Sequence, residues 1–287
     1  VYSGATQGWI PTIDDDVTDA PVAPKQGLFG FGTDGSNTAV TNLVSTAGVI
    51  GTDVTGVGTA RQQLGACEYG GDKGIFAYGY TVANVNMSNL VSNAGVVATD
   101  VTGVGTARSG NAACSYGEDK GIFGYGWVTG TTYTAVTNLV SNAGVVATDT
   151  AGFGGPGNLA TTNLVSNTGV VGADVAGVGT GRTVLAGAAY GTDKGLFGFG
   201  STGGAGRLGV TNLISNVGVV STDTAAVGTA RSGLGATQWG ADKAIFAFGT
   251  DGSLTAVSNL VSNTGVVATD TSGVGTAQQH GAACSFG

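Results

Sequence analysis

The sequence has 287 residues, of which 41% are hydrophobic, and its formal net charge is −8 with only ten lysines and arginines. So few basic residues exclude a surface that tracks the phosphates of nucleic acids. No stretch approaches the roughly 18 consecutive apolar residues of a membrane-spanning helix, so we expect no membrane span. The length allows two average domains, but a single all-β repeat domain can also be this long.

Residues 1–24 stand outside the pattern that fills the rest of the chain. They hold three of the four prolines and an acidic run formed by Asp14, Asp15, Asp16 and Asp19. We interpret them as an N-terminal extended arm or linker that its charges keep solvated. A calcium site is the alternative, since hard cations take carboxylate oxygens, but the Asp-x-Asp-x-Asp-Gly spacing is missing. No basic start followed by an apolar run is present, so we expect no signal peptide.

From Lys25 onward three sequence blocks return along the chain, and the copies of the second and third are 47 or 49 residues apart except for one spacing of 25. The first block is an apolar run that closes on glycine, at residues 25–32, 73–79, 120–126, 194–200 and 243–249. The second begins with Asn-Leu-Val/Ile-Ser, at Asn42, Asn89, Asn138, Asn163, Asn212 and Asn259. The third ends in an aspartate, at Asp53, Asp100, Asp149, Asp174, Asp223 and Asp270. Repeats of this size usually decide the architecture before local propensity does.

Each full repeat predicts four short strands. In the second repeat we expect them at residues 65–69, 74–80, 87–92 and 95–100. Phe76 and Tyr78 are two residues apart, so the alternation of a strand places them on one face. The Gly-Gly-Asp sequence at 70–72 predicts a tight hairpin between the first two strands. No window of useful length shows helical periodicity with caps, and we therefore expect a nearly all-β chain.

Four strands per repeat, repeated five or six times, are typical of a β-propeller. The order of an arginine, a small-residue strand and an apolar strand that closes on glycine, as in residues 231–249, also resembles the kelch repeat. Aromatic-Gly stands where a kelch repeat has a double glycine, and the late kelch tryptophan is absent. The resemblance covers residues 25–287 and implies a kelch-like β-propeller of four-stranded blades over that range.

The fourth repeat is incomplete. Residues 151–158 lead almost directly into Asn163, so the first two strands of that repeat are missing. We expect five complete repeats plus one truncated repeat, either as six blades with one incomplete or as five blades with two extra outer strands. Residues 280–287 match a first strand, whereas Lys25 begins at a second strand. The N- and C-terminal strands would then close the ring within one blade.

The repeats differ most where the second strand passes to the third, at residues 33–39, 80–86, 127–133, 201–207 and 250–255. Strand alternation places these loops on one rim, beside the connections that carry Arg61, Arg108, Arg182 and Arg231. Divergent loops on similar scaffolds are typical of a binding surface, although exposed loops also drift freely.

Aromatic faces and arginine side chains suit contacts with sugars or protein surfaces. We therefore predict ligand contacts on this rim. They are Tyr80, Trp127, Tyr133 and Arg207, together with Arg61, Arg108, Arg182 and Arg231.

The sequence gathers no residues for catalysis, a metal or a cofactor. His280, the only histidine, starts the closing strand, so no base for a Ser-His-Asp or Cys-His arrangement is indicated. The aspartates recur once per repeat, which indicates that each stabilises a turn or caps a backbone end. Glycoside hydrolysis would instead need two carboxylates paired in one cleft. Cys67, Cys114 and Cys284 are an odd number at equivalent positions, which favours small buried thiols over disulfides. We expect no catalytic residue, no metal, no cofactor and no enzyme activity.

These patterns favour a non-enzymatic recognition module, on a virion or an extracellular assembly, that binds a cell-surface glycan or protein through its variable rim. Residues 3–17 (SGATQGWIPTIDDDV) look similar to connecting pieces of bacteriophage tail or fibre proteins. The alternative is a purely structural virion component whose rim packs against neighbouring virion subunits. Ligand binding by the isolated chain separates these two hypotheses.

Overall fold

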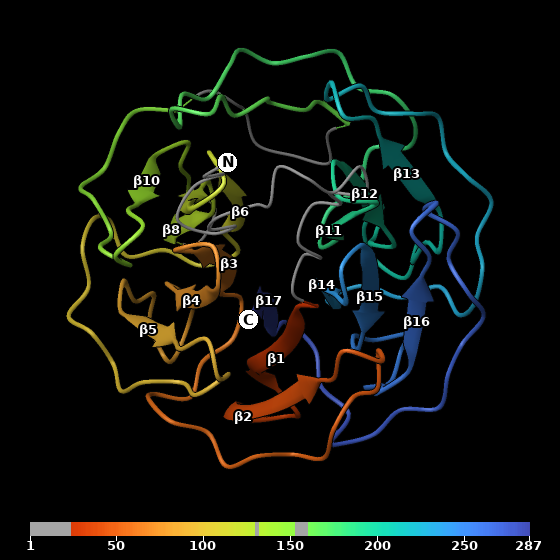
Figure 1. Ribbon diagram of the computed structural model, residues 1–287, viewed down its shortest axis with the longest axis horizontal. Coiled ribbons are helices and arrows are strands. Elements are labelled where there is room, and N and C mark those ends of the chain that lie inside the picture. The colour runs from red at the N-terminus through yellow and green to blue at the C-terminus, as the bar shows by residue number, and fades with distance from the viewer. Residues whose placement is uncertain (1–23, 130–131, 153–159) are drawn as a thin grey trace, which may run out of the picture.

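The computed structural model describes residues 24–129, 132–152 and 160–287, and this part of the chain forms strands and loops without a helix. Its strands build five three-stranded antiparallel sheets and one two-stranded ribbon. The five sheets lie around a common centre (Figure 1). The prediction of an all-β chain is confirmed. Nearly all of the predicted arm lies outside the described residues.

Each sheet has an inner, a middle and an outer strand, and we name it by its middle strand (Figure 1). The β1 sheet contains β17 (Ala282–Phe286), β1 (Gln26–Thr33) and β2 (Asn37–Val44), and the β4 sheet contains β3 (Gly65–Tyr69), β4 (Lys73–Ala77) and β5 (Ser88–Val91). The β7 sheet contains β6 (Ala112–Tyr116), β7 (Lys120–Gly124) and β10 (Thr137–Val140); the ribbon is formed by β8 (Trp127–Thr129) and β9 (Thr132–Tyr133). The β12 sheet contains β11 (Ala186–Tyr190), β12 (Lys194–Gly198) and β13 (Thr211–Ile214), and the β15 sheet contains β14 (Gly235–Trp239), β15 (Lys243–Ala247) and β16 (Ser258–Val261).

The core consists of apolar layers between neighbouring sheets. It forms there because the middle strands are apolar on both faces: β4, β7 and β15 are buried at every residue after their lysine. Aromatic rings of adjacent sheets pack edge to face, with 5.2 Å between the ring centroids of Phe31 and Phe76 and 5.5 Å between those of Tyr78 and Phe123. Each such pair adds about 0.5–1.5 kcal/mol beyond the burial of its surface.

Phe76 and Tyr78 do not share a face, so this prediction was wrong. Phe76 packs on Phe31 of the preceding sheet, whereas Tyr78 packs on Phe123 of the following sheet. The reason is that β4 ends at Ala77 and Tyr78 has a φ of 64°, in the left-handed region, which reverses the direction of its side chain. The equivalent residues have φ between 62° and 66°: Phe31, Tyr125, Phe199 and Phe248. The runs of the β1 and β4 sheets therefore supply one ring to each of their two neighbouring layers.

The predicted fourth strand of each repeat is also not formed as a strand. In the β4 sheet the run that ends in Asp100 meets the outer strand only through isolated bridges, such as that between Val97 and Val91. The buried Asn89 lies beside this run, and its amide donates to the oxygen of Ala98 (3.0 Å) and to Oδ1 of Asp100 (2.9 Å). An asparagine side chain thus takes the place of part of the backbone ladder. The expected four-stranded units are three-stranded sheets with a bridged outer run.

The two ends of the repeat region meet in the β1 sheet. The C-terminal strand β17 pairs antiparallel with β1, and Cys284 lies opposite Leu28. The predicted pairing of N- and C-terminal strands is therefore confirmed.

The truncated fourth repeat is an outer hairpin, which we call the short repeat (residues 160–178). It is held by isolated bridges, between Thr162 and Val175 and between Val165 and Val171. Inner strands of the other sheets contact one another in succession, β11 with β14, β14 with β17, β17 with β3 and β3 with β6, and no comparable contact joins β6 and β11. The short repeat lies between the β7 and β12 sheets (Figure 1).

The left-handed aromatic residue is followed by a glycine that the fold requires. Gly79 has a φ of 111°, and a β-carbon there would lie 2.8 Å from the oxygen of Gln62. We expect Gly79→Ala to lower the free energy of unfolding by about 2–4 kcal/mol, because a clash adds to an unfavourable φ. Gly71→Ala is the matched control, since Gly71 has a φ of 79° with nothing within 4 Å, and it should cost about 1 kcal/mol. Urea denaturation measures both; equal losses would contradict this packing.

Candidate functional site

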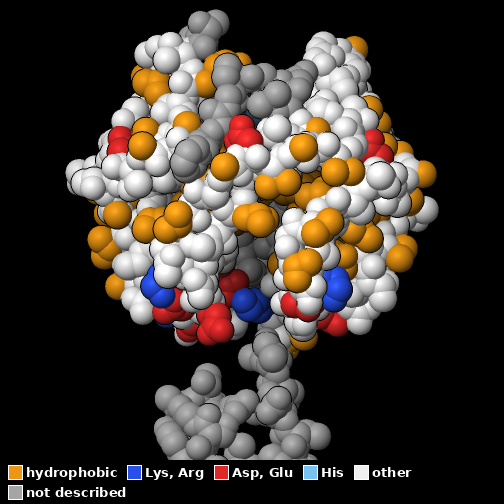
Figure 2. All heavy atoms as spheres, turned by 90° about the horizontal axis from the view of Figure 1, so that it is seen from above, with side chains coloured by type: hydrophobic (Ala, Val, Ile, Leu, Met, Phe, Trp, Pro, Cys, Tyr) orange, Lys and Arg blue, Asp and Glu red, His pale blue; other side chains and the backbone are white. Residues whose placement is uncertain are grey.

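The two ends of the sheets differ in charge. The turns between inner and middle strands carry pairs of lysine and aspartate, such as Asp72 with Lys73 and Asp119 with Lys120, each at 2.5 Å. Figure 2 shows the visible lysine and arginine side chains gathered at this end, which we call the hairpin face. The opposite end, which we call the loop face, carries the connections from middle to outer strands.

The loop face brings together the two sets of connections that the sequence placed on one rim. Each loop after a middle strand pairs, through an isolated bridge, with the connection that leads into the same sheet. These pairs are Thr33 with Gln279, Tyr80 with Gln62, Trp127 with Ser109, Ser201 with Thr183, and Thr250 with Ser232. The predicted arrangement of the loops therefore agrees with the structure.

Trp127 and Tyr133 lie side by side on this face. They face each other across the β8–β9 ribbon, where Trp127 is the pairing partner of Tyr133. Their ring centroids are 6.0 Å apart and the ring planes meet at 83°, so the two rings form a corner. The side chains are well exposed, Trp127 by 41% and Tyr133 by 50%.

Tyr80 lies on the adjacent sheet and is 38% exposed. Its loop is fixed to the tryptophan loop by Asn84, whose amide donates to the oxygens of Trp127 (2.8 Å) and Val128 (2.7 Å). In the same way Asn37 of the preceding loop donates to the oxygen of Thr81 at 2.9 Å. The role of these two asparagines was not predicted from the sequence, although each follows the first residue of its loop by four positions.

We call Tyr80, Trp127 and Tyr133 the aromatic patch. All other tryptophan, tyrosine and phenylalanine side chains in the described part of the chain are buried or only partly exposed. Three of the predicted contact residues are thus brought to neighbouring positions on one exposed surface.

Arg207 does not belong to this group. It lies in the loop that leaves the β12 sheet, where it pairs by a bridge with Ser201. Its guanidinium group is next to Gly252 in the corresponding loop of the β15 sheet. The short repeat separates its sheet from the one that carries Trp127 (Figure 1).

The four repeated arginines are not surface contacts, and this part of the prediction was wrong. Arg61, Arg108 and Arg231 are fully buried, and Arg182 is 7% exposed. The connections that carry them do lie on the loop face, but the side chains turn into the protein. The guanidinium of Arg61 lies over the ring of Phe31 at 4.3 Å, that of Arg108 over Tyr78 at 3.8 Å and that of Arg231 over Phe199 at 4.3 Å. Each ring belongs to the preceding sheet, so each arginine joins two sheets.

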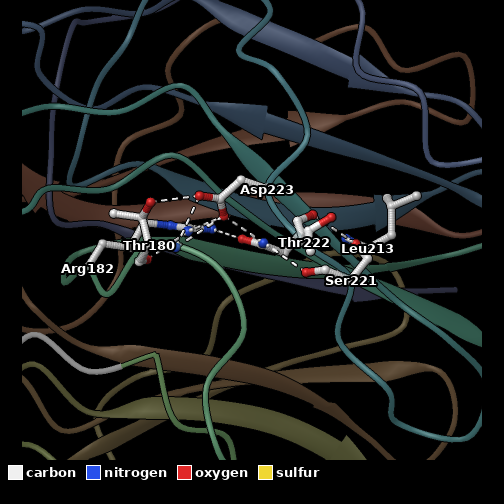
Figure 3. A network of polar contacts seen from close by, with 7 residues as sticks. Thr180, Arg182, Leu213, Ser221, Thr222 and Asp223 are labelled. Atoms are coloured by element: carbon white, nitrogen blue, oxygen red, sulfur yellow. Dashed lines mark hydrogen bonds and ion pairs between the residues drawn. The ribbon is translucent and has the colours of Figure 1, made fainter.

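A network of four polar residues explains why the arginines are buried (Figure 3). In the β12 sheet Asp223 accepts hydrogen bonds from the hydroxyl of Thr180 (2.7 Å) and the amide of Asn212 (2.8 Å). The backbone N–H of Thr180 also donates to this carboxylate, at 3.1 Å. Arg182 donates to Oδ1 of Asn212 at 2.5 Å and lies 3.7 Å from Asp223. The buried positive charge is therefore paired and hydrogen-bonded, as burial of a charge requires.

The same four positions, which we call the Thr-Arg-Asn-Asp network, recur in three further sheets, but the arginine donates to the asparagine only in the β12 and β15 sheets. The positions are Thr59, Arg61, Asn89 and Asp100 in the β4 sheet; Thr106, Arg108, Asn138 and Asp149 in the β7 sheet; and Thr229, Arg231, Asn259 and Asp270 in the β15 sheet. In the β1 sheet Thr276, Asn42 and Asp53 are joined in this way, with buried Gln278 at the arginine position. The prediction that the aspartates cap backbone groups is confirmed in these five sheets, because each accepts a hydrogen bond from the N–H of a threonine.

The hydrogen bonds of the network keep its members charged. The Thr180 hydroxyl, with help from Asn212, lowers the pKa of Asp223 below its usual 3.8. Burial lowers the pKa of Arg61 and Arg231 to about 10, which still leaves both protonated at neutral pH. The network is thus an internal ion pair rather than a site poised for proton transfer.

The remaining candidates for chemistry are scattered. His280 is partly buried, and its Nδ1 lies 3.4 Å from Oε1 of Gln62. Cys67 and Cys284 are buried as predicted, but Cys114 is exposed, so the prediction was wrong for that thiol. No group of three or more histidine, cysteine, aspartate or glutamate side chains that could hold a metal occurs among the described residues. No helix in the same part of the chain is long and apolar enough to cross a membrane.

Comparison with known proteins gives a likeness of fold. No family model and no curated protein sequence matches the chain. Among solved structures, the chain is similar to one described as a "novel fungal alcohol oxidase with catalytic diversity among the AA5 family, in complex with copper". The TM-score is 0.56 at 14% identity, and the match covers 88% of this chain and 66% of that chain.

This likeness corrects the expectation that the chain has no enzyme activity. An oxidase has a similar fold, so an all-β repeat architecture is no argument against catalysis. At 14% identity the likeness concerns the fold alone. The described residues gather no set of three metal ligands, and they therefore do not fit a copper site built from histidine, cysteine or carboxylate groups.

The network should make stability depend on acid pH. The folded-state pKa of Asp223 is lowered, so its carboxylate stabilises the protein above the unfolded-state pKa near 4, and this contribution is lost as pH falls through the folded-state value. We expect Asp223→Asn to lower the free energy of unfolding by about 1.5–3 kcal/mol at pH 7 and by less at pH 3.

A double-mutant cycle with Thr180→Val, followed by urea denaturation, separates this contact from other effects of the substitution. The two substitutions should be non-additive at pH 7, because either one removes the same hydrogen bond. Additive losses that do not change with pH would contradict the assignment.

Proposed function

We propose that residues 25–287 form a β-propeller with six positions around its ring, five taken by complete sheets and one by the short repeat. The order of packing supports this. The aromatic residue that ends an inner strand packs on the turn glycine of the next repeat: Phe286 on Gly95, Tyr69 on Gly144, Tyr116 on Gly169, Tyr190 on Gly265 and Trp239 on Gly48. Between the short repeat and the β12 sheet the contact is made by Leu164, which packs on Gly218. The six contacts therefore link each repeat to the next one and lead back to the first.

On this scaffold we propose that the loop face recognises carbohydrate. The observation that carries the proposal is the aromatic patch, whose three side chains are 38–50% exposed on neighbouring positions. Exposed aromatic groups that cluster in this way mark interaction sites, since an isolated chain gains nothing from leaving them in water. The apolar faces of sugar rings stack on such surfaces, and the tyrosine hydroxyls can accept or donate hydrogen bonds at their edges.

The local geometry and charge favour a neutral glycan. The perpendicular rings of Trp127 and Tyr133 offer one face to a sugar and an edge to its neighbour. The five lysines are paired with acidic residues, four of the five arginines are buried, and Arg207 lies in the loop of the β12 sheet. The patch therefore has no cluster of positive charge to attract phosphate or sulfate groups. A surface of this kind suits display on a virion or outside a cell, which is the setting we propose.

The test is binding of the purified chain to an array of immobilised glycans. We expect binding that Trp127→Ala and Tyr133→Ala each weaken at least tenfold, because each removes a stacking surface. Val82→Ala is the control, since Val82 is 92% exposed in the loop of Tyr80 but carries no ring. Absence of binding by the unmodified chain, or equal binding by all variants, would contradict the proposal.

A second candidate function, structural assembly with further copies of the chain, is favoured by the outer edge of the ring. One valine follows the turn glycine in every repeat, and all six are 62–65% exposed: Val49, Val96, Val145, Val170, Val219 and Val266. Figure 2 shows hydrophobic side chains spaced along the side of the molecule. Six equivalent apolar contacts around a perimeter suit lateral packing between subunits.

Sedimentation velocity tests this second candidate. We expect concentration-dependent association of the unmodified chain and its loss in the triple variant Val96→Asp/Val145→Asp/Val266→Asp, because buried carboxylates at an interface are unfavourable. Val82→Asp on the loop face should leave association unchanged. A monomer at all concentrations would rule this candidate out without affecting the glycan proposal.

A further inference from the structure

The ring has one open inner position, between β6 and β11. The inner strands β3 and β14 alternate between buried and half-buried residues, but β6 and β11 contain exposed ones. Cys114 on β6 is exposed, whereas the equivalent Cys67 and Cys284 are 5% and 3% exposed. An inner strand of the short repeat would cover these surfaces, and the short repeat has none in the described residues.

The neighbouring sheets keep the contacts that such a strand would make. In complete repeats a side chain at the middle of the inner strand packs on a glycine in the next middle strand. Thr237 lies 2.5 Å from the place of a β-carbon at Gly27, and Cys67 lies at the same distance from that of Gly121. At the equivalent Gly195 the three nearest atoms among the described residues come from its own sheet, the closest at 3.4 Å, so no described side chain of a preceding inner strand packs on it in this way.

A second contact is incomplete in the same place. The turn glycines Gly144 and Gly265 each meet both a tyrosine ring and a leucine of the preceding sheet. At Gly218, the turn glycine after the short repeat, the three nearest atoms among the described residues all belong to Leu164. Leu164 is itself 50% exposed. Among the described residues, no aromatic ring therefore takes the place beside Leu164 and Gly218 that Tyr69 and Tyr190 take at Gly144 and Gly265.

The N-terminal segment carries the sequence of the missing strand. Residues 4–7 (Gly-Ala-Thr-Gln) are identical to residues 235–238, which form the inner strand β14, and Trp9 follows where β14 ends in Trp239. In this alignment Thr6 corresponds to Thr237, the residue that packs on Gly27. The match has one departure: Gly8 is inserted before the tryptophan, so Trp9 comes one residue later than Trp239 does in the aligned sequence.

The direction and length of the segment fit this position. An inner strand ends at the hairpin face, and β1 starts there too, since Lys25 and Gly240 exchange backbone hydrogen bonds of 2.8 Å. Residues 8–23, at about 3.3 Å per extended residue, reach roughly 50 Å. A domain of this size has a radius of gyration of about 19 Å, so the segment can reach any position of its own ring.

We propose that residues 4–9 bind in the open position of the same molecule as its inner strand, with Thr6 packed on Gly195 and Trp9 beside Leu164 and Gly218. This is strand addition to an existing scaffold, in which side-chain pockets select the added strand. Residues 1–24 contain no counterpart of a middle strand, so the proposal concerns the inner strand alone. The arm is then a part of the ring.

The accessibility of Cys114 tests the proposal in the full chain. We expect a maleimide to label Cys114 slowly in the unmodified protein and at least tenfold faster in Thr6→Arg, because arginine does not fit against Gly195. Thr18→Arg places the same charge in the same segment outside the motif and should label as slowly as the unmodified protein. Peptide mapping by mass spectrometry reads the label, and unreactive Cys67 and Cys284 show that each variant is folded.

Two further arms of the experiment separate the possible occupants. A peptide of residues 3–10 added in excess should restore protection of Cys114 in Thr6→Arg. Protection in the unmodified protein should be the same over a hundredfold range of chain concentration. Protection that grows with concentration would place the segment in a second copy and overturn the proposal. Equal, fast labelling of the unmodified protein and Thr6→Arg would overturn it as well.

Discussion

In each complete sheet one aspartate carboxylate receives the N–H and hydroxyl groups of a threonine from the connection that enters the same sheet. Asp100 binds Thr59 in this way, and Asp53 binds Thr276 although 223 residues separate them. Hydrogen bonds to a charged group are among the stronger ones, at about 1.5–3 kcal/mol each. Strands of four or five residues form marginal sheets by themselves. The carboxylate stabilises such a sheet by joining its outer run to the start of its inner strand.

The arginine and the left-handed aromatic residue extend this contact from one sheet to the next. Arg61 donates to the oxygen of Tyr78 in its own sheet and stacks on Phe31 of the preceding one. The close approach also requires glycine: a β-carbon at Gly58, whose φ is 90°, would lie 2.5 Å from Oδ1 of Asp100. The Thr-Arg-Asn-Asp network, the aromatic layer between the sheets and the glycine beside the aspartate therefore depend on one another. What is left to vary is the loop face, where the aromatic patch lies.

The periodicity of the sequence was enough to predict the strands β3 and β4, their hairpin and the pairing of β17 with β1, because these follow from local turn residues and from matching blocks. The opposite faces of Phe76 and Tyr78 were not predictable, since alternation assumes a strand that continues, and the backbone turns at Tyr78. Asn89 lies in the third strand as predicted, but its side-chain amide binds the run that was expected to form the fourth strand, and that run has only isolated bridges. The arginines were placed at the surface because burial of a charge is unfavourable until its partners, here Asn259 and Asp270 for Arg231, are known.

The most direct measurement of the central contact is amide hydrogen exchange at the network threonines. Thr59, Thr180, Thr229 and Thr276 lie in exposed connections, yet their N–H groups are bound to carboxylates. The account predicts that all four exchange far more slowly than an exposed loop amide such as that of Val82. Exchange at the rate of Val82 would show that the carboxylates do not hold the sheets, and would contradict the account.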